Sequence, residues 1–234
     1  ENRLGKMNEI LIRNRVKRFM WSSDISKMYN QLHLNLGAYP YSLFLFHPDL
    51  DPQVDPDVYV MTVAWYGVSS TGGQSGYAIE QVAQQAQGHD HARDALLNDR
   101  FVDDVATGAM TENERELQIE SCRELLSSAG FSLKFVAKSG EAPCEKASKD
   151  LKSMKLLGYV WVPQDDFLSP GVAELNFNKK IRGAKKPNPE PIVEKEQAQE
   201  LMQDLILTRK MITSKVAEFY DPIGVWEPIK LQMK

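Results

Sequence analysis

The sequence predicts an α+β fold, and two observations support this prediction. Segments 41–46 and 58–65 are rich in β-branched and aromatic residues and flank a loop of prolines and aspartates. Segment 111–130 begins with a capping box (Thr111, Glu114), carries an apolar stripe at helical spacing and stops at a glycine. Strands and helices are mixed in an order that favours antiparallel pairing over an alternating parallel sheet.

The other elements follow from local patterns. Apolar residues at helical spacing predict a helix over 2–15, and the β-rich run 18–24 predicts a short strand that ends at Asp24. A glycine- and serine-rich stretch, 67–76, precedes a Gln- and Ala-rich helix that is expected from about Tyr77. The sequence further predicts a helical turn over 25–32, strands over 131–137 and 154–162, a linker over 179–191, and one or two helices over 192–219.

The composition is that of an ordinary globular protein, with 42% hydrophobic and 26% charged residues. There is no apolar run of membrane-spanning length and no hydrophobic leader at the start, so we expect a chain that neither spans a membrane nor is exported. The two cysteines, Cys122 and Cys144, lack metal-ligand spacing and favour a reducing compartment.

The net charge of −4 argues against coating of nucleic acid by bulk electrostatics, so a nucleic-acid site would have to be a local groove. Two basic clusters are candidates for part of such a groove, although a cluster of this kind is more often solvated surface or linker. The clusters are Arg13, Arg15, Lys17 and Arg18, and then Lys179, Lys180, Arg182, Lys185 and Lys186.

The stretch "NDRFVDDVATG" places two adjacent carboxylates, Asp103 and Asp104, between short apolar runs. Magnesium prefers hard oxygen ligands, and three aspartates at the ends of neighbouring strands would suit two such ions in phosphoryl transfer. Asp24 could be the third only if the fold brings it near. The alternative is a solvated hairpin tip, because aspartate also favours turns, and the short motif alone leaves both interpretations open.

Five blocks in order make the sequence similar to a known family: "DISKMYNQLHL", "YGVSSTGGQSGYAIEQ", "FVDDV", "AGFSLKF" and "LLGYVWVPQDD". Together they resemble reverse transcriptase motifs A to E, and "RKMITSKVAEFYDPIGVWEPIKLQMK" resembles the segment after the polymerase core in BEL/Pao LTR retrotransposons. The resemblance implies a right-hand polymerase palm, an antiparallel sheet backed by helices, over 1–165 with a remnant of the fingers. It implies a helical thumb-like or connection segment over 166–234, and the activity of an RNA-directed DNA polymerase.

The resemblance assigns Asp24, Asp103 and Asp104 to the catalytic aspartates, which with the carbonyl of Ile25 would hold two Mg²⁺ ions, or Mn²⁺. Lys134 is the candidate for the motif D lysine, which could protonate departing pyrophosphate as a general acid.

A rival for that role is Lys138, because the register of the motif is open. For either lysine, a solvated strand position is the alternative.

The implied nucleotide-binding residues are Tyr29, Gln74, Ser75 and Gly76. Tyr29 would pack under the incoming sugar and exclude a 2′-hydroxyl, although an ordinary packed aromatic is the alternative. Gln74 to Gly76 fall on a glycine-rich turn and helix start, where glycine permits close approach and a helix N-terminus favours anions; the alternative is a flexible loop. Tyr77 stands where proline is common in the family, so the contacting residue stays open.

The implied primer and template contacts are Phe101, Val102, Gly158 and Tyr159. Phe101 replaces the usual tyrosine of the four-residue catalytic motif and lacks its hydroxyl, which puts a polar contact to the duplex in doubt. Gly158 and Tyr159 match the hairpin that grips the primer end, although a buried hairpin glycine is the alternative.

The resemblance also implies a context. The partners would be an RNA or DNA template with primer, deoxynucleoside triphosphates and the protease, ribonuclease H and integrase of a Pol polyprotein, in cytoplasmic virus-like particles. Most of the fingers region would precede this chain, so we expect little or no synthesis by the chain alone. Two rival functions remain: a noncatalytic or domesticated module that binds nucleic acid or a partner, and another palm-fold metalloenzyme such as a nucleotide cyclase.

Overall fold

The computed structural model describes residues 5–49, 54–148 and 151–170 and a few positions further on. These positions are 208, 209, 213, 216, 221, 223, 224 and 227–232. The chain forms two compact units, of which the first comprises Glu1–Leu157 with Val162–Phe167 and the second Gly158–Trp161 with Leu168–Lys234. In the described part of the chain, no helix combines the length and the apolar character that crossing a membrane requires.

A four-stranded sheet in the order β4-β5-β1-β6 forms the centre of the first unit. Its strands are β1 (Phe19–Ile25), β4 (Arg100–Phe101), β5 (Asp104–Ala109) and β6 (Leu133–Lys138), and every neighbouring pair is antiparallel. The predicted α+β class with antiparallel strands is therefore confirmed.

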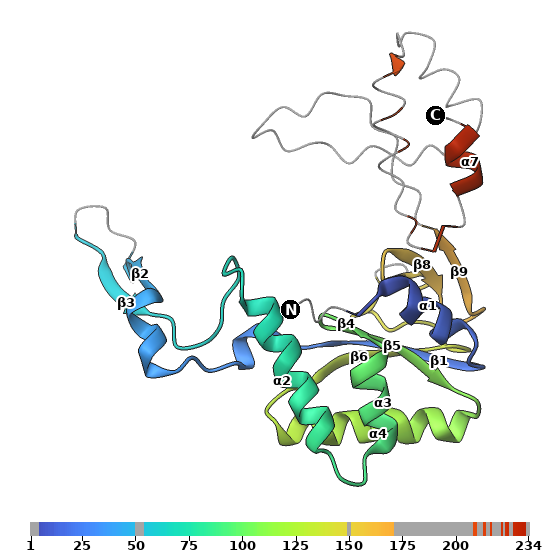
Figure 1. Cartoon of the computed structure of the whole chain (residues 1–234), viewed down its shortest axis with the longest axis horizontal. Helices are drawn as coiled ribbons and strands as arrows, with labels where there is room; N and C mark the ends of the chain where they lie inside the picture. Colours follow the sequence, from blue (N-terminus) through green and yellow to red (C-terminus); the bar gives the residue numbers. More distant parts are fainter. Residues whose placement is uncertain are drawn as a thin grey trace. The chain divides into compact units, whose positions relative to one another are not determined.

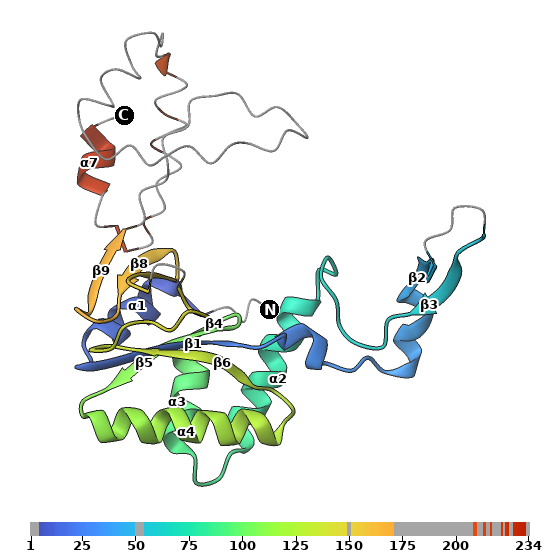
Figure 2. The ribbon, with the colours of Figure 1, turned by 180° about the vertical axis from the view of Figure 1, so that it is seen from behind.

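Helices cover both faces of this sheet (Figures 1 and 2). Helix α1 (Met7–Arg15) lies on one face, whereas α2 (Thr71–Gln85), α3 (Asp90–Asn98) and α4 (Glu112–Ser128) lie on the other. The main core lies between the sheet and these three helices. It includes Trp21, Ile25, Ile79, Ala83, Ala92, Ala95, Leu96, Val105, Ile119, Cys122 and Leu126, all almost fully buried.

Helix α4 begins as its sequence predicts. The Thr111 side chain accepts a hydrogen bond from the Glu114 amide, and the Glu114 carboxylate accepts one from the Thr111 amide. These two bonds satisfy amides that a helix start leaves without a partner. Gly130, with a φ of 80°, lies just past the end of the helix, in a conformation that glycine adopts at no steric cost.

One expectation about the helices was wrong, and one helix was missed. Helix α2 starts at Thr71, not near Tyr77, so the glycine-rich stretch is largely helical. Burial of Thr71, Ser75 and Ile79 on one face stabilises this helix against the low propensity of its glycines. Helix α3 was not predicted at all.

A close approach between β1 and β5 explains one glycine of the sheet. A Cβ atom added at Gly108 would lie 2.6 Å from the Phe19 carbonyl oxygen, which is far below a normal contact. Any side chain at this position would therefore push the two strands apart.

Between the 3₁₀ helix Met28–Gln31 and α2, the chain makes a long excursion that carries a separate antiparallel pair, β2 (Leu43–Phe46) and β3 (Asp57–Val60). The predicted strand over 58–65 thus stops at Val60. Backbone hydrogen bonds join the two ends of the excursion, from Leu34 N to Thr62 O at 2.9 Å and from Ala64 N to Leu32 O at 2.8 Å.

Strands β7 (Met154–Leu156), β8 (Tyr159–Val162) and β9 (Phe167–Pro170) form a three-stranded sheet, so the predicted strand over 154–162 is split by a turn. In the second unit, the Tyr159 hydroxyl donates a 2.9 Å hydrogen bond to Asp221, and helix α7 spans Glu227–Gln232. The predicted linker and the second basic cluster lie outside the described residues, as does most of the predicted helical region 192–219.

Candidate functional site

The antiparallel register of β1 and β5 brings Asp24 opposite Asp104. Side chains alternate between the faces of a strand, and Trp21 and Ile25 of β1 point into the helical core. Asp24 therefore points to the opposite face. Val105 is also in the core, so Asp104 shares that face with Asp24.

Asp103 lies in the tight turn that joins β4 to β5, and a 2.8 Å hydrogen bond from the Ile25 amide to the Asp103 carbonyl fixes this turn to the end of β1. Val102, just before it, has a φ of 55°. A β-branched residue in this left-handed region is strained by about 1–3 kcal/mol, a strain that is typical of functional turns. The three predicted aspartates thus come from one strand end and one strained turn.

Burial and the neighbouring carboxylates raise the pKa values of Asp103 and Asp104. The pKa of Asp103 lies above its ordinary value, first because of burial and then because of the hydrogen bond and the charge of Asp24. The pKa of Asp104 is raised to about 6 by burial and by the charges of Asp103 and Asp24. Groups with perturbed pKa values of this kind gather at functional sites.

Lys134 supplies positive charge at the site. Its ammonium group forms an ion pair with Asp24, and this pairing raises the pKa of the lysine. The rival lysine, Lys138, instead donates a 2.7 Å hydrogen bond to Glu116 of α4. The structure therefore places Lys134, and not Lys138, beside the predicted catalytic aspartates.

The donors available for a metal ion are the carboxylates of Asp24, Asp103 and Asp104. These are hard oxygen ligands of the kind that magnesium prefers. The pKa values of Asp103 and Asp104 are raised first by burial and then by the neighbouring negative charge, and a bound cation would offset that charge. Within the described ranges, no group of three or more His, Cys, Asp or Glu side chains is arranged to hold a metal ion. The oxygen donors therefore fit magnesium. The side chains of Asp24 and Asp103 are hydrogen-bonded to each other, whereas Asp104 interacts with both through its charge.

Tyr29 lies near the start of α2 and within electrostatic reach of Asp103. Burial, and then the charge of Asp103, raises the pKa of its phenol. Its hydroxyl would lie 3.8 Å from a Cβ atom added at Gly72, and its ring meets that of Tyr66 edge to face with centroids 5.1 Å apart. Tyr66, 72% exposed, is a residue that the sequence interpretation did not single out.

The other predicted nucleotide contacts lie within α2 itself. Ser75 and Gly76 are buried, and the Ser75 hydroxyl donates a 3.0 Å hydrogen bond to the Gly72 carbonyl. Gln74 is exposed, and its amide donates a 3.3 Å hydrogen bond to the Ser70 hydroxyl. Of the three, only Gln74 presents its side chain to solvent.

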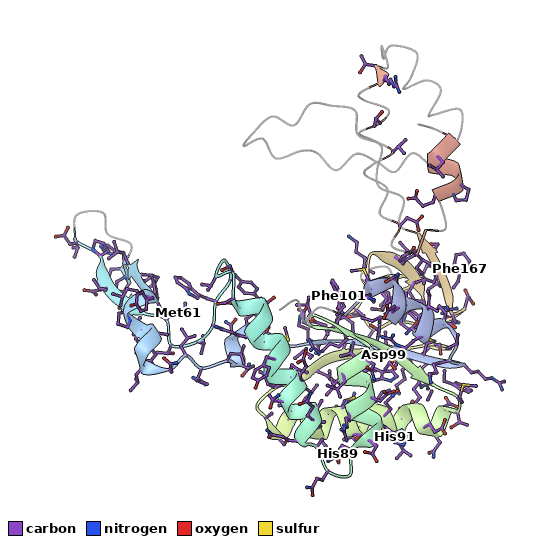
Figure 3. All side chains as sticks on the ribbon, viewed as in Figure 1. Met61, His89, His91, Asp99, Phe101 and Phe167 are labelled. Carbon is purple, nitrogen blue, oxygen red and sulfur yellow. The ribbon has the colours of Figure 1, made fainter. Side chains whose placement is uncertain are left out.

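Phe101 is the register partner of Asp104, so its ring lies on the carboxylate face at the β4 edge of the sheet, where Figure 3 labels it. The predicted primer contacts Gly158 and Tyr159 belong to the second unit. Tyr159 is buried there, and its hydroxyl is engaged with Asp221. Gly158 has a φ of 87°, the conformation that a glycine adopts freely in a tight turn.

Arg100 is a second residue that the sequence interpretation missed. It is only 8% exposed, and its guanidinium donates hydrogen bonds to the carbonyls of Leu96, Val102 and Gly76. No local pattern distinguishes such an arginine from a solvated one, because its acceptors are all backbone groups.

The first basic cluster is largely engaged within the fold. Arg13 pairs with Asp99 at 2.8 Å, Arg15 pairs with Asp166 at 2.7 Å, and Arg18 lies over the Phe19 ring. Three of the four basic side chains of this cluster therefore already have partners within the fold.

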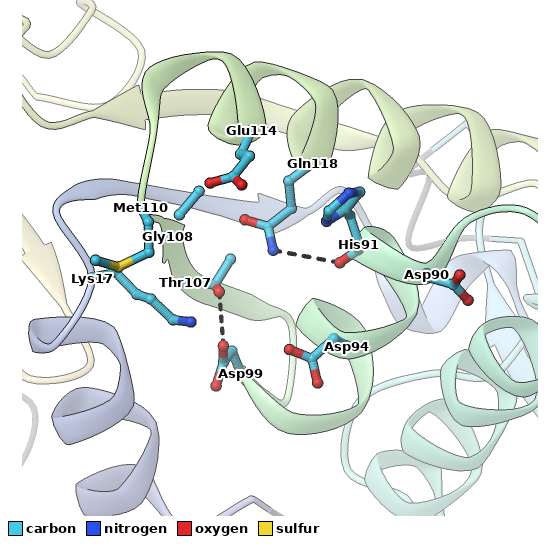
Figure 4. Close-up of a pocket in the computed structure, with 11 residues that line it drawn as sticks. Lys17, Asp90, His91, Asp94, Asp99, Thr107, Gly108, Met110, Glu114 and Gln118 are labelled. Carbon is cyan, nitrogen blue, oxygen red and sulfur yellow. Dashed lines mark hydrogen bonds between the residues drawn. The ribbon is translucent and has the colours of Figure 1, made fainter.

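A cavity of about 300 Å³ lies elsewhere in the first unit, among β5 and the starts of α3 and α4 (Figure 4). Asp99, Thr107, Gln118 and Lys17 are among its lining residues. The Thr107 hydroxyl donates to Asp99 at 2.7 Å, and the Gln118 amide donates to the His91 carbonyl at 3.4 Å. Of the candidate residues predicted from the sequence, Lys17 of the first basic cluster lines this cavity, whereas none of the predicted catalytic, nucleotide-binding or primer-binding residues does.

Comparison with known proteins adds no relative. No protein-family model matches the chain, and a search of curated proteins finds no match either.

Proposed function

We propose that the chain is the palm, with a thumb-like segment, of an RNA-directed DNA polymerase from a BEL/Pao-type retrotransposon. One observation carries the proposal: the β1–β5 register sets Asp24 beside the Asp103–Asp104 turn, as a carboxylate site for nucleotidyl transfer requires. The palm would occupy 1–165, with a remnant of the fingers, and the thumb-like segment 166–234. The ordered sequence blocks supply the rest of the support.

Each residue of the site has a proposed task. Asp24, Asp103, Asp104 and the Ile25 carbonyl would hold two magnesium ions. When bound, these ions would acidify the attacking hydroxyl and steady the leaving pyrophosphate.

Lys134 is proposed to give a proton to departing pyrophosphate, since its ammonium group already lies at Asp24. Tyr29 is proposed to lie under the incoming sugar, because its hydroxyl lies close to Gly72 at the start of α2 and its phenol feels the charge of Asp103. Its bulk would leave no room for a 2′-hydroxyl. The exposed ring of Tyr66 is packed against it.

A noncatalytic function is the alternative, and one observation favours it. The Lys134 ammonium already neutralises Asp24, and the described side chains include no ready group of three metal-ligating residues. Such a module would bind nucleic acid or a partner through the same fold without turnover.

Primer extension tests the proposal. A longer Pol chain that contains these residues, given a primed RNA template, deoxynucleotides and Mg²⁺, should incorporate nucleotides, and Asp103→Asn or Asp104→Asn should abolish incorporation. Glu124→Gln, an exposed change on α4, serves as the matched control. Equal synthesis by the aspartate variants would refute the proposal, and template-independent product would favour a cyclase-like enzyme.

A further inference from the structure

We infer that Arg100 is a positioning residue, which holds the Val102–Asp103 turn in its strained conformation and so sets where the Asp103 carboxylate lies. The inference rests on the proposed function in that Asp103 is taken as a working residue of the site. Arg100 itself touches neither substrate nor reacting atoms.

Three separate segments meet at this guanidinium. Nε donates to the Leu96 carbonyl of α3 at 3.2 Å, Nη1 to the Val102 carbonyl of the turn at 2.6 Å, and Nη2 to the Gly76 carbonyl of α2 at 3.3 Å. The planar fork of an arginine can reach three acceptors in fixed directions, which a lysine ammonium on a flexible stem cannot do. Arg100 thus ties the turn to two helices at once.

The turn needs such a support. Val102 has a φ of 55°, which a valine holds only when its surroundings over-determine it. The shortest of the three bonds from Arg100 goes to the carbonyl of this strained residue. The second support is the bond from the Ile25 amide to the Asp103 carbonyl, so the turn is held from both of its sides.

The positive charge of Arg100 also acts on carboxylates near the turn. Burial lowers the pKa of its guanidinium, while the negative charges of Glu80 and then of Asp103 act in the opposite direction, so Arg100 interacts electrostatically with both carboxylates. A buried charge is retained at a cost, and here its hydrogen bonds all go to backbone carbonyls around the site.

The chain provides a structural arginine as a control. Arg115 is 1% exposed, and it bonds to Ser139 O at 3.0 Å and to the Glu112 and Glu116 carboxylates, none of which belongs to the carboxylate site. Its loss should destabilise the fold without moving the turn.

The experiment compares Arg100→Met, Arg100→Lys and Arg115→Met in this chain with two readouts. The first is hydrogen exchange of the Ile25 amide, which reports its bond to the Asp103 carbonyl. The second is Mn²⁺ binding followed by electron paramagnetic resonance. Thermal unfolding is recorded in parallel, so that all variants are compared while they are folded.

In Arg100→Met we expect Ile25 exchange to accelerate about tenfold relative to other sheet amides, and Mn²⁺ binding to weaken by a similar factor. Arg100→Lys should recover part of both losses, and it provides the readout if the methionine variant does not fold. Arg115→Met should lower the unfolding temperature and leave both readouts within about twofold of the parent.

Unchanged Ile25 exchange in the Arg100 variants, or equal acceleration in Arg115→Met, would overturn the inference. If the parent chain binds no Mn²⁺, the proposed metal site fails, whereas the Ile25 amide still decides the role of Arg100. The two failures are therefore distinguishable.

Discussion

Asp24 and Asp104 are register partners on neighbouring antiparallel strands, so two carboxylates that are distant in sequence share one face of the sheet. Asp103 in the adjoining turn is bonded to the end of the same strand. Like charges brought this close cannot all ionise at low cost, and the chemistry of the site starts from that conflict.

Asp104→Asn should stabilise the protein at neutral pH in the absence of divalent cations. The pKa of Asp104 is raised from 3.8 to about 6, so ionisation lowers the free energy of unfolding as pH rises from about 4 to about 6. With allowance for solvent screening, the variant should gain on the order of 1 kcal/mol at pH 7 and nothing below pH 4. Urea unfolding across this pH range measures the difference. A constant gain at all pH values would contradict the expectation.

Lys134→Met should tighten the binding of a divalent cation to the isolated chain, because the ammonium group competes for Asp24. Because the lysine side chain is about half exposed, we expect the Mn²⁺ dissociation constant to fall by only about two- to fivefold. Lys138→Met, which removes the partner of Glu116, is the matched control and should leave binding unchanged. Weaker binding by Lys134→Met would show that the lysine supports the site instead of competing with the ion.

Gly108→Ala should destabilise the sheet, because the added Cβ atom would meet the Phe19 carbonyl at 2.6 Å. Overpacking against backbone typically costs about 1–3 kcal/mol. Gly73→Ala is the opposite case, since a Cβ atom there would meet nothing within 4 Å and the residue lies within α2. This change should stabilise by about 0.5–1 kcal/mol. Urea midpoints test both, and a neutral Gly108→Ala would mean that the strands can separate freely.

Only one of the two thiols should react in the native protein. Both cysteines are free; Cys144 is exposed, whereas burial raises the pKa of Cys122 to about 12. A thiol-specific chromogenic reagent should modify Cys144 at once and Cys122 only after denaturation, since the thiolate is the reactive form. Cys144→Ala should abolish the fast phase, and a persisting fast phase would place Cys122 at the surface.

The elements that the sequence predicts well are those whose signals are local. Helix α4 follows from its cap, its stripe and its glycine, and β1 ends within one residue of the predicted end. Helix α2 starts earlier than predicted because tertiary burial outweighs the low propensity of Gly72 and Gly73.

The candidate site depends on information that local patterns do not carry. The proximity of Asp24 to the Asp103 turn comes from strand register, and only the resemblance to a family led to it in advance. Arg100 gave no signal at all, because its partners are backbone carbonyls from three segments.

The excursion between Gln31 and Thr71 is part of the first unit, and its two ends meet at one place, where Leu32 to Leu34 face Thr62 to Ala64 across backbone hydrogen bonds. Because its ends are already joined, closing a shorter or longer loop there changes the chain entropy only slightly. We therefore expect that a change in the length of the chain between these two ends would leave the register of β1 and β5, and with it the aspartates, in place.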